Sequence, residues 1–139
     1  MTDSTKIEFR YRRIRDVDDL TDLVAIIFPG NRNQQHAAAR ILLALKAAET
    51  PVPSLRVLEH QHGISRRTLE RTRAKLTRVG LIEFVSPLSK RSNGQPGWRL
   101  SSRMSGALRL LADKIEAWRN DDRPERREKD ERLVELIRP

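Results

Sequence analysis

Cationic side chains recur at helical spacing between Ser65 and Arg78, and a row of guanidinium and ammonium groups can bind a polyanion. On a 3.6-residue period, Leu69, Thr72 and Leu76 would face inward. The opposite face would then carry four cations in a line, namely Arg67, Arg71, Lys75 and Arg78. Like charges at this spacing repel by about 0.2–0.5 kcal/mol per pair, a cost that a bound polyanion would relieve. The alternative interpretation is an ordinary solvated basic face.

The distribution of charge along the chain favours a polyanion ligand over an ordinary solvated face. The 139 residues include 28 Lys and Arg against 19 Asp and Glu, a formal net charge of +9. Residues 31–102 carry 13 basic and four acidic side chains, whereas residues 1–30 have a net charge of −1 and residues 103–139 one of +1. Because the whole excess lies in the middle segment, the sequence predicts an electrostatic footprint there.

Helical patterns surround the basic row. The acidic start and the apolar spacing that follows it predict a helix over about 17–28, which Pro29-Gly30 ends. A second helix, capped by Asn31 or Asn33, ends before Thr50. A short helix is capped by Ser54 and ends near His62-Gly63. A third is capped by Ser65, continues through Val79 and ends at Gly80.

The hydrophobic period changes after Gly80. Residues 81–85 and 97–101 predict two strands of a β-hairpin, joined by a Ser-, Pro- and Asn-Gly-containing loop. The alternation over Ile7–Arg13 predicts a further short strand or an extended arm, and its basic part, Arg10–Arg15, is either a second nucleic-acid contact or a solvated strand edge. The predicted fold class is therefore mainly α with a small β-hairpin (α+β), with Trp98 on the returning strand expected in the core.

The stretch Gly63-Ile-Ser-Arg-Arg-Thr-Leu69, with Leu76 seven positions later and Gly80-Leu-Ile82 after it, resembles the recognition-helix region of winged helix-turn-helix DNA-binding proteins. The likeness is to bacterial regulators of the GntR type in particular, and it covers about residues 33–101. Arg73 departs from the pattern, because those regulators usually carry an apolar residue there. No effector-binding domain is recognisable.

A helix of this kind enters the DNA major groove, where its first turn approaches the bases. The candidates for base reading are Arg66, Arg67, Thr68 and Arg71, and those for phosphate contact are Lys75 and Arg78. Ser65 would cap the helix and donate to a phosphate. In the hairpin loop, Lys90 would lie along the DNA backbone and Arg91 would enter the minor groove. Asn93 is either a further contact or, with Gly94, only a turn.

The C-terminal segment carries large apolar residues at strict 4-3 spacing, namely Met104, Leu108, Leu111, Ile115 and Trp118. This spacing is typical of a helix that pairs with a second copy, although a helix docked on its own domain would show it too. We expect a homodimer, and a last, mostly charged helix over about 125–137. The predicted organisation is an N-terminal arm and helix (1–30), a winged helix-turn-helix domain (31–102) and C-terminal dimerisation helices (103–139).

Several classes of protein are not expected. The chain has no Cys, its three His residues (His36, His60 and His62) lack the spacing of a metal site, and no phosphate-binding loop motif occurs. We therefore predict no enzyme activity, metal or cofactor, and no small-molecule effector is evident from the sequence. The longest apolar runs are too short to cross a membrane, and the N-terminus lacks the apolar core of a secretory signal, so a cytoplasmic location is expected.

These observations predict a small dimeric transcriptional regulator that binds specific double-stranded DNA. Two alternatives remain open at this point. The same module would serve in a plasmid or phage replication or partition protein, and winged domains are also used to contact proteins or RNA.

Overall fold

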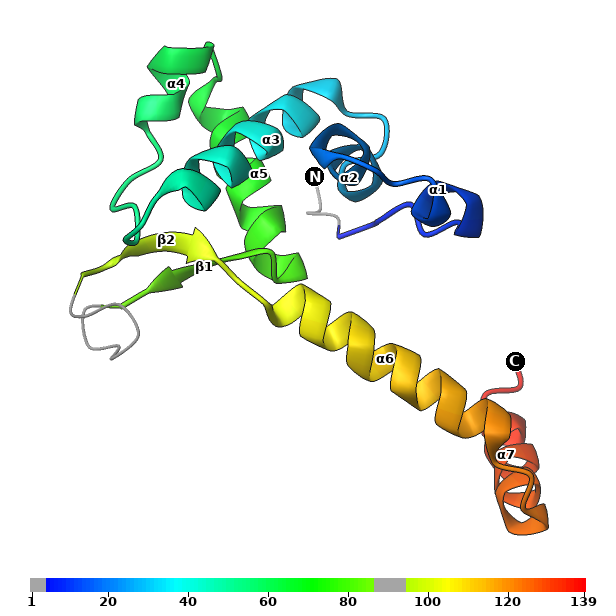
Figure 1. Cartoon of the computed structure of the whole chain (residues 1–139). Coiled ribbons are helices and arrows are strands. Elements are labelled where there is room, and N and C mark those ends of the chain that lie inside the picture. The colour runs from blue at the N-terminus through cyan, green and yellow to red at the C-terminus, as the bar shows by residue number, and fades with distance from the viewer. Residues whose placement is uncertain (1–4, 87–94) are drawn as a thin grey trace. The chain divides into compact units, whose positions relative to one another are not determined.

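The structure is a computed structural model that describes residues 5–86 and 95–139. It is mainly helical, with one two-stranded antiparallel sheet (Figure 1). Its elements are α1 (Tyr11–Arg15), α2 (Leu20–Ile27), α3 (Arg32–Ala47), α4 (Val57–His62), α5 (Arg66–Val79), β1 (Ile82–Val85), β2 (Gly97–Leu100), α6 (Arg103–Asn120) and α7 (Pro124–Leu136). The chain divides into two compact units, residues 1–104 and 105–139.

Local sequence signals set most of the helix ends. Asp19 and Asp22 form a capping box at the start of α2, so this helix begins later than the expected residue 17. Asn31, one of the two predicted caps, accepts a hydrogen bond from the Gln34 amide at the start of α3. Of the two alternatives predicted for Ile7–Arg13, the short strand is not observed, whereas the extended arm is observed in part. The segment is extended only as far as Arg10, because no second strand pairs with it among the described residues, and α1 follows.

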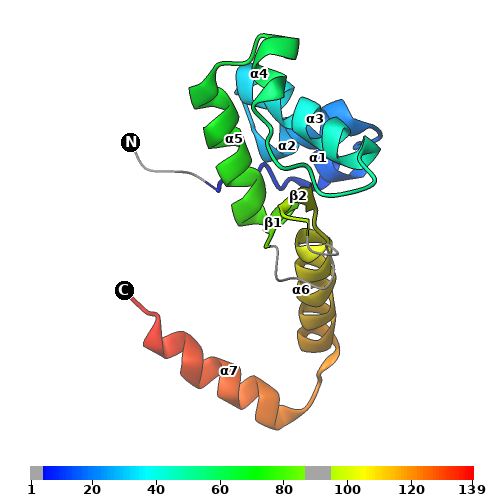
Figure 2. The same ribbon diagram turned by 90° about the vertical axis from the view of Figure 1, so that its left-hand side faces the viewer.

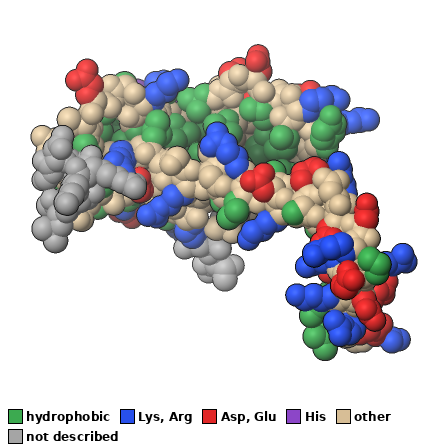
Figure 3. Space-filling view, turned by 60° about the horizontal axis from the view of Figure 1, so that its bottom comes forward, with side chains coloured by type: hydrophobic (Ala, Val, Ile, Leu, Met, Phe, Trp, Pro, Cys, Tyr) green, Lys and Arg blue, Asp and Glu red, His purple; other side chains and the backbone are tan. Residues whose placement is uncertain are grey.

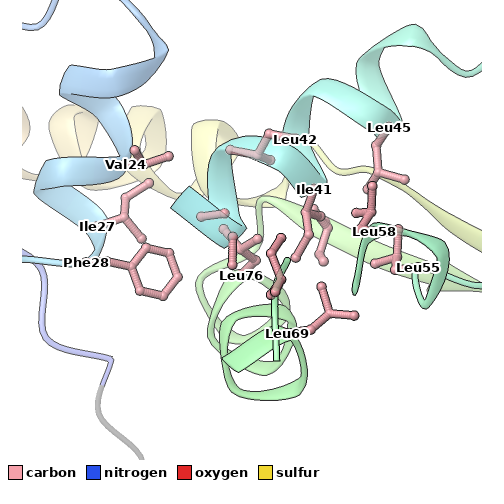
Figure 4. Packing of buried hydrophobic residues seen from close by; sticks show 14 residues of the cluster. Val24, Ile27, Phe28, Ile41, Leu42, Leu45, Leu55, Leu58, Leu69 and Leu76 are labelled. Carbon is pink, nitrogen blue, oxygen red and sulfur yellow. The ribbon is translucent and has the colours of Figure 1, made fainter. Parts of the chain in front are cut away.

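The core of the first unit is formed by one face each of α2, α3 and α5, with α4 and β1 closing it. Figure 4 shows the apolar side chains of these elements pointing toward one another. Leu69, Thr72 and Leu76 of α5 are buried, as the sequence spacing predicts. Because α5 packs against α3 along this stripe, its opposite side is left facing solvent.

Two glycines allow close backbone approaches around the hairpin. Gly80 ends α5 in the left-handed conformation, and a Cβ there would lie 2.9 Å from the Met104 amide nitrogen. Gly97 has a φ of 154°, and a Cβ there would lie 2.7 Å from the carbonyl of Val52. That contact is close because Val52 forms a backbone bridge with Trp98, which fixes the loop after α3 to the edge of β2.

Candidate nucleic-acid interface

The N-terminus of α5 is held by its predicted cap. The Ser65 Oγ accepts a hydrogen bond from the Thr68 amide at 3.1 Å and donates to the Thr68 Oγ1 at 2.9 Å. The cap prediction is therefore confirmed. The hydroxyl hydrogen that the sequence interpretation assigned to a phosphate is instead used inside the chain, where it orients the half-buried Thr68.

The solvent side of α5 is predominantly basic. Arg66, Arg67 and Arg78 are exposed and Arg71 is half-buried, while the only carboxylate on this helix is Glu70. The guanidinium of Arg66 lies 3.9 Å from the Glu59 carboxylate of α4, and its side chain remains 59% exposed. A loose ion pair of this kind contributes little to the stability of the fold and leaves the cation accessible to another partner. We call these four arginines the basic face of α5.

Lys75 does not belong to this face, contrary to the prediction from sequence. It is only 7% exposed, its Nζ donates to the Lys6 carbonyl oxygen at 2.8 Å, and it lies 4.8 Å from the centre of the Phe28 ring. Burial, with a smaller contribution from the nearby charge of Arg78, lowers the pKa of the Lys75 ammonium. A phosphate contact by Lys75 would need an exposed ammonium, so this part of the site prediction is wrong.

The spacing of α5 contains a signal that would have placed Lys75 correctly. It lies three residues after Thr72 and four before Val79, and both of these positions face the core side. The sequence interpretation gave more weight to its charge than to its position. Lys6, which holds Lys75 through its carbonyl group, had no signal of its own because a backbone acceptor carries no sequence signature.

Arg73, the departure from the winged-helix pattern, packs against the hairpin. Its guanidinium lies 4.9 Å from the centre of the Trp98 ring, and Trp98 also makes an edge contact with Phe84 across the sheet at 5.2 Å. Trp98 is half-buried against the core rather than fully inside it. A cation stacked on an aromatic ring is an attractive contact, so Arg73 is held against the sheet rather than exposed to solvent.

The described part of the hairpin balances its own charge. Glu83 of β1 is paired with Arg99 of β2 at 3.0 Å and lies 3.7 Å from Arg103. The predicted contacts of the hairpin loop, Lys90, Arg91 and Asn93, lie outside the described residues.

The predicted dimerisation residues lie on α6. Met104 is half-buried and belongs to the first unit, while the other four are exposed. No residue of α6 or α7 is buried. On the face of the second unit, residues 105–139, that Figure 3 shows, basic, acidic and hydrophobic side chains are interleaved. The Trp118 indole N–H donates to the Asp130 carboxylate at 3.0 Å and so joins α6 to α7.

Other kinds of site find little support in the described part of the chain. There, no group of three His, Asp or Glu side chains is arranged to hold a metal ion. Burial and the charges of Arg40 and His36 lower the pKa of His62. Among the described helices, none is both long enough and apolar enough to cross a membrane.

Comparisons with protein-family models, curated proteins and solved structures find no match for this chain.

Proposed function

We propose that the protein binds double-stranded DNA by placing the basic face of α5 in the major groove. In this proposal α4, the turn at Gly63 and α5 form a helix-turn-helix, and β1 and β2 form the wing of a winged domain. The left-handed conformation of Gly63 supports this arrangement, because it allows the short turn between α4 and α5. The order of three helices followed by a hairpin beside α5 supports it too (Figure 2).

The observation that carries the proposal is the basic face itself. The side of α5 away from the core presents four arginines and one carboxylate, so a groove lined by phosphates would find matching charge there. Arg66, Arg67 and Arg71, with Thr68, lie in the first half of α5 and are assigned to base edges, where arginine pairs bidentately with guanine. Arg78, near the C-terminal end, is assigned to a phosphate.

We further propose that the protein acts as a homodimeric transcriptional regulator. The four apolar residues Leu108, Leu111, Ile115 and Trp118 give α6 an exposed stripe at coiled-coil spacing. A second copy paired along this stripe would present two α5 helices to half-sites one helical turn, about 34 Å, apart.

A DNA titration at two salt concentrations tests the proposal. Fluorescence anisotropy with a labelled duplex should show affinity falling about 10³–10⁵-fold between 50 and 200 mM salt if six to ten phosphates are contacted. A variant with Arg66, Arg67 and Arg71 all replaced by Ala should lose this binding. The matched control removes the same number of charges from α6 and α7. It replaces the exposed residues Arg109, Arg127 and Arg132 by Ala and should keep the binding.

Two outcomes would overturn the proposal: binding that does not respond to salt, or full binding by the triple variant of α5. Structured RNA serves as the competitor in the same assay. If it displaces the duplex at lower concentration than unlabelled DNA does, RNA rather than DNA is the ligand. Selection from a random duplex pool then tests the dimer, because two α5 helices related by the two-fold symmetry of a dimer would bind a palindromic site.

A further inference from the structure

The N-terminal arm, which we define as residues 5–10, is fastened to the first unit at two points. The Glu8 amide donates to the Ile26 carbonyl oxygen at the end of α2, at 3.0 Å. The second point is the bond from the Lys75 ammonium to the Lys6 carbonyl oxygen. In Figure 2 the dark-blue arm accordingly runs beside the lower half of α5.

Lys75 is a costly residue at this position if its only task is packing. Removing an ammonium from water costs several kcal/mol unless polar partners replace the water, whereas an apolar side chain of similar length would be buried there at no such cost. The partners observed are a carbonyl oxygen of the arm and the face of Phe28. An apolar side chain could not donate the hydrogen bond to the Lys6 carbonyl oxygen, so this bond to the arm distinguishes Lys75 from an apolar residue at the same position.

The arm and the hairpin lie on opposite edges of the basic face. Successive residues of an α-helix are rotated by about 100°, so Arg73 and Lys75 point about 200° apart around α5. Arg73 stacks on the hairpin and Lys75 holds the arm. The exposed arginines lie on the arc between these two edges. A helix in the major groove is flanked by one phosphate backbone on each side, and the hairpin can approach only one of them.

We propose that the N-terminal arm contacts the DNA backbone on the side of α5 away from the hairpin, with the exposed Lys6 on a phosphate and Lys75 as the residue that positions the arm. This inference rests on the proposed function and extends its interface.

Salt-dependent binding of single variants tests the proposal. Lys6→Gln should lower the slope of log affinity against log salt by about 0.9, which corresponds to about an eightfold loss of affinity at 0.1 M salt. Lys75→Met removes the ammonium while keeping the apolar chain, and should give the same loss. The double variant should lose no more than either single variant, because a released arm cannot use Lys6. Arg132→Gln on α7 is the control and should bind as the original protein does.

A second measurement separates positioning from a merely structural role. Hydrogen exchange of the Glu8 amide should become faster in Lys75→Met but stay unchanged in Lys6→Gln. Rapid exchange with undiminished DNA affinity would overturn the proposal, and so would a Lys6→Gln variant with the original salt slope. Should Lys75→Met fail to fold, as judged by thermal unfolding, Lys6→Gln decides alone. Failure of DNA binding by the unmodified protein would instead refute the proposed function.

Discussion

The two units of this chain are stabilised in different ways. The first unit buries a continuous apolar cluster that runs from Val24 to Ile82. The second, residues 105–139, buries no residue of its two helices and is connected by polar contacts such as the one between Trp118 and Asp130. Because isolated helices without tertiary packing are marginal in water, the second unit needs a surface to pack on. The first unit supplies its own core, whereas neither helix of the second buries a residue that could form one.

The strongest test of this contrast is a truncation in the core of the first unit. Leu76 is 0% exposed, so Leu76→Ala should lower the free energy of unfolding by about 3–5 kcal/mol through lost burial and a residual cavity. Urea unfolding followed by circular dichroism measures this. Leu110→Ala, at an exposed position of α6, is the matched comparison and should change the free energy of unfolding by less than about 0.5 kcal/mol.

A charge on the α6 stripe should act on association instead. Leu111→Asp places a carboxylate in the proposed dimer seam, where an unpaired charge costs several kcal/mol, so we expect the dimer dissociation constant to rise at least about 100-fold. Sedimentation velocity over a concentration series measures it. Leu110→Asp makes the same change on the same helix but away from the stripe, and should leave the dimer intact. Equal effects of the two variants would show that the stripe is not the seam.

Recognition of DNA should depend on the first unit. Arg67→Ala should reduce discrimination between the selected site and a mismatched one by about 1–3 kcal/mol, because a bidentate base contact is lost. Competition binding with the two duplexes measures this. Arg132→Ala, in the second unit, should leave discrimination unchanged. Lys90→Ala should weaken binding to both duplexes about equally, and if it altered discrimination as Arg67→Ala does, the division between base and backbone contacts would be wrong.

The smallest expected effect concerns acid sensitivity of the second unit. Arg123 donates to both carboxylate oxygens of Asp121, at 2.9 and 2.8 Å, and these hydrogen bonds lower the pKa of Asp121 to about 2. A depressed pKa in the folded state means that the pair stabilises the turn before α7 above pH 3.8, and that this contribution is lost as the pH falls from 3.8 toward 2. Arg123→Gln should move the pKa of Asp121 back toward 3.8, as carboxyl carbon NMR would show. An unchanged pKa would mean that another group holds it down.

Sequence patterns predicted the elements that follow from local rules. The caps at Asn31 and Ser65, the end of α5 at Gly80 and the inward stripe of α5 all depend on residues close together in the chain, and the structure confirms them. For Ile7–Arg13 the sequence left a strand and an extended arm open. Only the arm is observed, as far as Arg10, because a strand needs a partner, which a local pattern cannot supply. The assignment of Lys75 failed because its charge was given more weight than its position between Thr72 and Val79. Only the identity of its partners, Lys6 and Phe28, could not be predicted from local spacing.

The site itself was predictable only in part. Arg66, Arg67 and Arg78 are exposed on the solvent side of α5, where the helical period puts them. The stacking of Arg73 on Trp98 was not predictable, because it joins a helix to a strand that is placed by its pairing with β1 and by the backbone bridge between Val52 and Trp98. Residues that meet across elements in this way are fixed by tertiary packing rather than by spacing.

The glycines of the first unit differ in how freely evolution could replace them. Gly30 and Gly63 have positive φ values but open space around an added Cβ, so asparagine, which tolerates this backbone region, could replace either at modest cost. Gly80 combines a positive φ with crowding by the backbone of Met104. No alternative amino acid meets both conditions, so among divergent descendants of this chain position 80 should stay glycine long after positions 30 and 63 have drifted.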